Sequence, residues 1–178
     1  MKSSVVIDDG TARVRTLLIL LGFGVLVVLL HNAFRFPLNL PGRHGLDAMA
    51  LFAMGRLISN ERWAAGVVGT SAGGTALLVG AGAWAGLLYP ICGVIVDLAC
   101  RWLPNWRRSL FVLPVIAGLA WASRPVVRGL LAEGSGLTFD SLRHGFLWPV
   151  FTHLLFGMVG AFVAVLGWRA WQERARRH

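Results

Sequence analysis

The sequence contains little charge for its length. Only 14% of its 178 residues are charged and 56% are hydrophobic, whereas an average soluble domain has about 25% charged and about 45–50% apolar residues. The mean hydropathy is +0.67. This composition is that of a membrane protein and not of a soluble globular domain.

Catalytic signatures and cysteine pairs are also lacking. The sequence has no GxSxG or HExxH motif and no pair of carboxylates at helical spacing within an apolar run, so we expect no enzymatic activity. Cys92 and Cys100 lie in one apolar run about two helical turns apart, too far for a disulfide within one helix. We expect both to be buried free thiols, and we expect no metal site.

Long apolar runs are what the sequence has instead. Runs of about 18 residues or more, enough to cross a bilayer as a helix, recur along the chain. We predict an all-α, polytopic membrane protein with six transmembrane helices in a single membrane domain (1–178). The predicted spans are residues 14–34, 45–58, 63–83, 85–103, 109–131 and 146–171. The second is shorter than the roughly 20 residues a span needs, and the fifth either ends at 123 or continues past Pro125.

Basic residues are distributed unevenly around these spans. Six spans put both termini on one side, and of the 17 Lys and Arg residues all but five fall on that side. The five on the opposite side are Arg35, Arg43, Arg124, Arg128 and Arg143. Because Lys- and Arg-rich loops stay in the cytoplasm, we place both termini there, in a bacterial cytoplasmic (inner) membrane. This arrangement accounts for the net charge of +9, and we expect no nucleic-acid partner.

The two longest predicted loops lie on the outer side, which makes that side the place of recognition. The first, residues 34–46, contains two prolines that limit its open conformations and two glycines that let it turn sharply. The second spans residues 124–145. The polar residues in or beside these loops that we select as ligand-binding candidates are Arg43, His44, Asp47, Arg143 and His144.

Aromatic and histidine side chains add candidates on the same side. Trp84, Tyr89 and Trp148 either anchor the chain in the interfacial belt or line a ligand pocket. His31 closes the first span and His153 lies about two turns into the sixth, so facing helices would bring both onto one haem iron. No HxxxH, ExxH or CxxCH motif supports haem, and a histidine that is hydrogen-bonded or lines a polar cavity is favoured.

Two features inside the spans have competing explanations. Asp97 is acidic and lies well inside a span, and Arg101 follows four residues later, so we predict a local ion pair between them. A proton- or substrate-coupling role and contact with a partner subunit are the alternatives. Gly69 and Gly73 form a GxxxG pair, which allows close approach of another backbone. That backbone belongs either to this chain or to a partner membrane subunit.

The order of these features matches a known family. The segment PLNLPGRHGLDAMALFAMGRLISNERWAAGVVGTSAGG (37–74) combines a Pro-rich loop, a short second helix, a basic turn and a Gly/Ala-rich third helix. The stretch YPICGVIVDL (89–98) then places small residues before an aspartate. In these respects the chain resembles the substrate-binding S components of energy-coupling factor (ECF) vitamin transporters.

The resemblance implies a membrane-embedded subunit that binds a small vitamin-like, anionic metabolite for uptake, with the 34–46 loop as an outer lid. Arg43 would clamp a carboxylate or phosphate. A membrane coupling subunit and ATPase subunits would supply energy, docking on small residues, here Gly22, Gly69 and Gly73. The first span departs from the family because it lacks an AxxxA motif. The substrate-binding candidates are Arg43, His44, Asp47, Trp84, Tyr89, Arg143, His144, Trp148 and His153.

Two rival functions remain open. The chain is either an integral anchor or subunit of a larger membrane complex, including a haem-containing redox complex that uses His31 and His153, or a standalone transporter or channel. Under the S-component interpretation no cofactor is expected.

Overall fold

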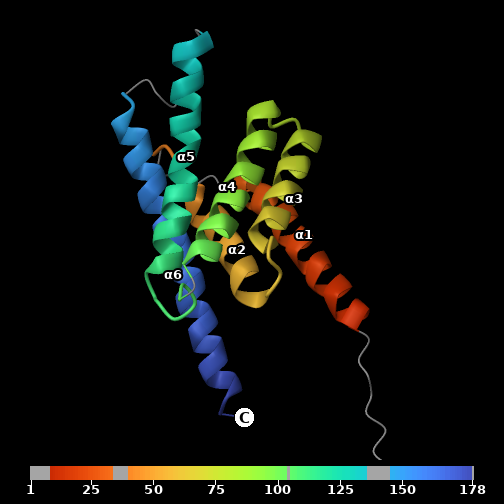
Figure 1. Cartoon of the computed structure of the whole chain (residues 1–178). Helices are drawn as coiled ribbons and strands as arrows, with labels where there is room; N and C mark the ends of the chain where they lie inside the picture. Colours follow the sequence, from red (N-terminus) through yellow and green to blue (C-terminus); the bar gives the residue numbers. More distant parts are fainter. Residues whose placement is uncertain (1–8, 34–39, 104, 136–144, 178) are drawn as a thin grey trace, which may run out of the picture.

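The computed structural model describes residues 9–33, 40–103, 105–135 and 145–177, and in these ranges the only regular secondary structure is helical. The predicted all-α class is therefore confirmed. The helices are α1 (Asp9–Ala33), α2 (Gly45–Ile58), α3 (Ala64–Leu78), α4 (Ala83–Trp102), α5 (Val112–Ser135) and α6 (Leu147–Ala175). Figure 1 shows them as one bundle.

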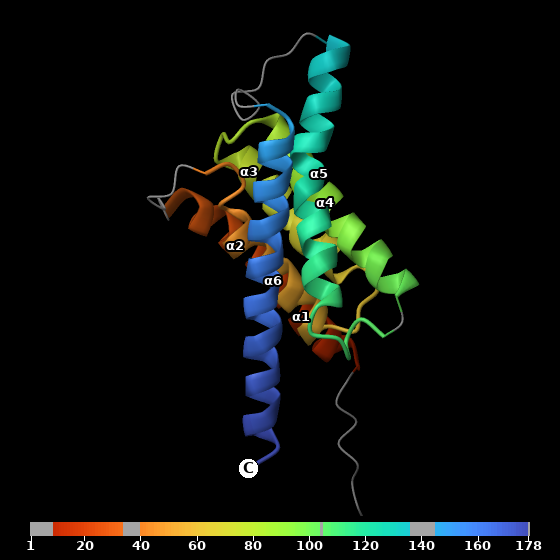
Figure 2. The ribbon, with the colours of Figure 1, turned by 90° about the vertical axis from the view of Figure 1, so that its left-hand side faces the viewer.

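Successive helices run in alternating directions through the bundle. The start of α1, the α2–α3 turn, the α4–α5 connection and the end of α6 lie at one end, which we call the terminal end (Figures 1 and 2). The α3–α4 turn, the end of α5 and the start of α6 lie at the other. The short α2 begins partway down the bundle, beside the end of α1 (Figure 2).

The short helix α2 forms the centre of the core. It packs against α1, α3, α5 and α6, and its Met49, Phe52 and Ala53 are fully buried. Its bounds are those of the second apolar run predicted from the sequence. Because neighbouring helices surround α2, a helix of this length could lie inside a membrane bundle without spanning the bilayer itself.

Glycines allow α3 and α4 to pack backbone to backbone. A Cβ at Gly69 would lie 2.6 Å from the Tyr89 carbonyl oxygen, and one at Gly73 would collide with the Gly86 carbonyl. Pro90 has no N–H to donate to that Gly86 carbonyl, and its ring also faces Gly73. The faces of Gly69 and Gly73 are therefore covered by α4 of the same chain, whereas a Cβ at Gly22 on α1 would meet no atom within 4 Å.

Helix α5 continues through Pro125 and ends at Ser135. This settles the two alternatives for the fifth apolar run in favour of the longer one. Arg124 and Arg128, which the loop assignment puts on the outer surface, belong to the helix, and Arg124 is only 6% exposed. The start predicted for the second outer loop, at residue 124, is therefore wrong.

Three helices are long and apolar enough to cross a membrane: Gly10–Ala33, Ala83–Trp102 and Leu147–Ala175. Large apolar side chains on their surfaces are exposed, among them Leu18, Leu87 and Val163. Such surfaces suit contact with lipid acyl chains and make the structure compatible with a membrane protein.

The tight α3–α4 contact predicts a strong effect of one methyl group. Gly69→Ala is expected to lower stability by roughly 1–3 kcal/mol, because the Tyr89 carbonyl cannot move without shifting the helix backbone. Gly74→Ala is the matched control, since its Cβ would meet no atom within 4 Å and alanine favours a helix by up to about 1 kcal/mol. Thermal unfolding in detergent measures both, and equal melting temperatures for the two variants would contradict the packing.

Candidate functional site

Arg124 lies buried at the centre of a polar cluster inside the bundle. Its guanidinium carbon lies 4.6 Å from the centroid of the Tyr89 ring and 4.2 Å from the centroid of the Trp121 ring. The ion pairs among the described residues are Arg13–Glu61 and Arg56–Asp97, so within this part of the chain Arg124 has no carboxylate partner. Two aromatic faces stabilise the cation, and no described carboxylate neutralises its charge.

The turn that precedes α2 is packed onto this arginine's neighbours. Gly42 has φ +82°, a conformation that favours glycine, and a Cβ there would lie 2.7 Å from the His153 ring. The Trp121 Nε1–H donates a hydrogen bond to the Gly42 carbonyl oxygen at 3.0 Å. Residues 40–44 are thus held against α5 and α6, while residues 34–39 of the predicted lid lie outside the described residues.

His44 and His31 stack beside the turn. Their ring centroids are 3.7 Å apart with an interplanar angle of 26°. The Arg43 Nε–H donates to His44 Nε2 at 3.4 Å, which makes Nε2 the acceptor and assigns the His44 proton to Nδ1. Burial, together with the charges of His31, Arg43 and Arg124, lowers the pKa of His44 to about 4. His44 is therefore neutral at pH 7.

Tyr89 and His153 complete the cluster. The Tyr89 hydroxyl lies 3.5 Å from His31 Nδ1. His153 Nδ1 lies 2.7 Å from the Pro149 carbonyl oxygen, which can only accept, so Nδ1 carries the proton and Nε2 is left as an acceptor. The centroid of the Trp121 ring is 6.2 Å from that of Tyr89 and 6.1 Å from that of His153. We call the set His31, His44, Tyr89, Trp121, Arg124 and His153 the histidine–arginine cluster.

The predicted candidates fall into three groups. Arg43, His44, Tyr89 and His153 lie in or next to the cluster. Asp47, on the first turn of α2, has an Oδ2 atom that is buried without a hydrogen-bond partner among the described residues. The remaining candidates lie elsewhere: Trp84 is half-buried at the start of α4, Trp148 is 46% exposed and stacks on Phe151, and Arg143 and His144 lie outside the described residues.

Two central members, Arg124 and Trp121, are absent from the sequence-based candidates. The sequence signal for Arg124 is the stretch Arg124-Pro-Val-Val-Arg128, which places two arginines four residues apart after an apolar run. If Pro125 ends the helix, as is common, these arginines fall in a loop. Since the helix continues, they lie on one face of α5.

Asp97 has a structural role at the terminal end of the bundle. Its carboxylate accepts hydrogen bonds from the backbone N–H groups of Ala65 (3.2 Å) and Gly66 (2.6 Å), at the start of α3. The predicted ion pair between Asp97 and Arg101 is wrong. Arg101 is exposed, and Asp97 Oδ1 lies 3.4 Å from Arg56 Nε. The free N–H groups of a helix start attract a carboxylate, and this position brings Asp97 next to α2.

The cysteines form no disulfide, as the sequence predicts. Cys92 and Cys100 are free and buried, and the Cys92 thiol donates to the Ala120 carbonyl oxygen at 3.2 Å. His31 and His153 both belong to the cluster, but one face of His31 is covered by His44. In the part of the chain that the structure describes, no group of three or more His, Cys, Asp or Glu residues is placed to hold a metal ion.

No protein-family model, curated protein or solved structure matches this chain. The function is therefore argued from the residues of the cluster themselves.

Neutral His44 predicts a loss of stability in acid. The folded-state pKa, about 4, lies below the usual 6.5, so below pH 6.5 the unfolded chain binds more protons and stability falls as the pH drops towards 4. Replacing His44 by phenylalanine keeps a ring for stacking and removes this titration. Thermal unfolding between pH 7 and pH 5 is expected to shift less in His44→Phe than in the wild type, and parallel shifts in both proteins would refute the assignment.

Proposed function

We propose that this chain is a membrane-embedded substrate-binding subunit for the uptake of a small, anionic, vitamin-like metabolite, of the kind found in ECF transporters. The observation that carries the proposal is Arg124, a buried guanidinium packed between two aromatic rings with no carboxylate partner among the described residues.

A buried unpaired cation favours an anionic ligand on energetic grounds. Removing a guanidinium from water costs several kcal/mol, and cation–π contacts return only about 2 kcal/mol each when they are desolvated. A carboxylate or phosphate that reached Arg124 would bind through two parallel hydrogen bonds. Arg43, next to His44, adds a second positive charge to the same region.

The neutral members of the cluster narrow the ligand further. Trp121 and Tyr89 offer flat apolar faces beside the guanidinium. His153 Nε2 is an acceptor that can take a hydrogen bond from an N–H or O–H group. These groups together fit a small molecule with one anionic group, a hydrogen-bond donor and a flat or apolar body.

The turn at residues 40–44 would act as the gate. Breaking one hydrogen bond, from Trp121 Nε1 to the Gly42 carbonyl, would free the turn from α5. Arg124 and Arg128 belong to helix α5 and not to an outer loop. The predicted outer loops then contain three arginines, Arg35, Arg43 and Arg143. This lower number strengthens the argument from charge that the termini are cytoplasmic. We therefore keep six spans, cytoplasmic termini and a bacterial inner membrane as part of the proposal.

Energy would come from partner subunits, since the sequence contains no GxxxxGK[ST] nucleotide-binding motif. The outward face of α1 is the proposed docking surface for a membrane coupling subunit. Gly22 lies there in open space, next to the exposed side chains of Leu18, Leu21 and Val25. Gly69 and Gly73 do not belong to this surface because α4 covers them.

Arg124→Gln tests the proposal. It is expected to weaken binding of the anionic ligand roughly tenfold to hundredfold, the value of a hydrogen bond to a charged group. Isothermal titration of purified protein against a panel of carboxylate- and phosphate-bearing vitamins provides the measurement. Arg124→Lys keeps the charge without the planar fork and should bind with intermediate affinity.

Arg101→Gln is the matched control, because it removes one exposed arginine outside the cluster. Unchanged affinity in Arg124→Gln, or equal weakening in Arg101→Gln, would overturn the role of Arg124. Circular dichroism and gel filtration identify any variant that fails to fold.

The haem-containing anchor remains the rival function, because His31 and His153 lie in one cluster. An absorption spectrum of protein purified from its native membrane separates the two. The binding-subunit proposal predicts no Soret band, and a Soret band lost in His153→Ala would favour the anchor.

A further inference from the structure

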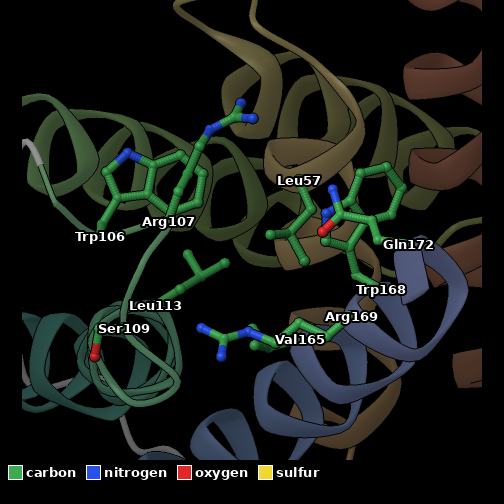
Figure 3. A pocket seen from close by; sticks show the side chains of 9 residues that line it. All are labelled: Leu57, Trp106, Arg107, Ser109, Leu113, Val165, Trp168, Arg169 and Gln172. Atoms are coloured by element: carbon green, nitrogen blue, oxygen red, sulfur yellow. The ribbon is translucent and has the colours of Figure 1, made fainter. Parts of the chain in front are cut away.

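A second polar site lies at the terminal end, at the end of α2 opposite to the histidine–arginine cluster. Figure 3 shows the side chains that line it. It is a cavity of about 100 Å³ between the end of α2, the α4–α5 connection, α5 and α6. Leu57, Leu113 and Val165 supply its apolar lining, and Arg107, Arg169 and Gln172 its polar lining. The last three also line a second hollow of about 360 Å³, so the two spaces are neighbours. We call them together the arginine pocket.

The arginine pocket carries excess positive charge. The hollow of about 360 Å³ is lined by four arginines and one acid, Glu173. The arginines are Arg107, Arg108, Arg169 and Arg176. None of these five residues takes part in an ion pair between described residues. Burial, and then the charge of Arg56, lower the pKa of Arg107. The excess of arginines over acids therefore makes the pocket suited to binding an anion.

Backbone carbonyls fix two of these arginines in place. Arg107 donates to the carbonyl oxygens of Arg56 (3.1 Å) and Ser59 (2.7 Å) at the end of α2. Arg169 reaches from α6 to the Arg108 carbonyl oxygen at 2.8 Å. These bonds position the guanidinium groups and supply no negative charge. The side chains of Arg108 and Arg176 have no hydrogen bond or ion pair with another described residue and are exposed.

Tryptophan side chains lie in the pocket and at the same end of the bundle. Trp106 and Trp168 line it. Trp102 and Trp171 lie at the same end with exposures of 76% and 58%, and Trp171 stacks on Trp168 at 4.9 Å. Tryptophan prefers the membrane–water interface, where its ring meets both apolar and polar groups.

We propose that the arginine pocket binds the phosphate group of an anionic phospholipid. The phosphodiester would lie among Arg107, Arg108, Arg169 and Arg176, where guanidinium groups donate in pairs to phosphate oxygens. The apolar lining beneath would take the glycerol and the first acyl carbons. Basic pockets between membrane helices on the cytoplasmic side recognise anionic headgroups in this way. The site is separate from the ligand site around Arg124 and does not depend on it.

The test is native mass spectrometry of the full chain, delipidated in mild detergent and titrated with phosphatidylglycerol or with phosphatidylcholine of the same acyl chains. The wild type is expected to retain phosphatidylglycerol preferentially. The double variant Arg108→Gln/Arg176→Gln should bind it about tenfold more weakly, since each lost basic group removes part of the headgroup attraction. Neither side chain supports the fold, so the variant should remain folded.

Arg174→Gln/Arg177→Gln is the matched control: it also removes two positive charges from the terminal end, at positions that do not line the pocket. It should keep the lipid preference, as should Arg124→Gln and the charge-preserving Arg108→Lys/Arg176→Lys. Equal weakening in the control, or equal retention of phosphatidylcholine by the wild type, would overturn the site. Displacement of the lipid by millimolar inorganic phosphate would assign the pocket to a soluble phosphate and overturn the lipid proposal.

Discussion

The hydrogen bond from Trp121 Nε1 to the Gly42 carbonyl is the contact on which the candidate site depends. It holds the turn before α2 against α5, and this position stacks His44 on His31 and brings Gly42 against His153. The same indole covers one side of the Arg124 guanidinium. The turn can enter the bundle because α2 is short and is surrounded by four other helices. A full-length second span would place this turn at the membrane surface instead.

The two buried arginines, Arg56 and Arg124, differ in their partners, and this contrast supports the proposed ligand site at Arg124. Arg56 is paired with Asp97, whose oxygens also accept two backbone N–H groups from the start of α3. That ion pair joins α2, α3 and α4 and balances the charge of Arg56, although Arg56 Nε is buried without a hydrogen bond among the described residues. Arg124 has aromatic faces but no anion in the described part of the chain. Because an unpaired buried charge is expensive, a fold that keeps one has a use for it.

Local patterns predicted much of this fold, and failed where partners lie far apart in the sequence. The bounds of α2 followed from an apolar run between a Pro-rich loop and a polar turn. Local spacing pairs Asp97 with Arg101, because a helix brings the fourth residue near, whereas in the structure the start of α3 and Arg56 contact the carboxylate. Arg124 was assigned to a loop because proline often ends a helix, whereas packing against α6 carries α5 through Pro125. The Gly69/Gly73 pair fitted either an internal or an external partner, and only the structure shows that the partner is α4.

The central claim is that Arg124 is the anchor for an anionic ligand, and the small molecules that co-purify with the chain test it most directly. Protein extracted from its native membrane in mild detergent is denatured, and the released molecules are identified by mass spectrometry. The account predicts an acidic metabolite in near-stoichiometric amount from the wild type and its loss from Arg124→Gln, while the folded state persists. An identical metabolite in equal amount from both proteins would contradict it.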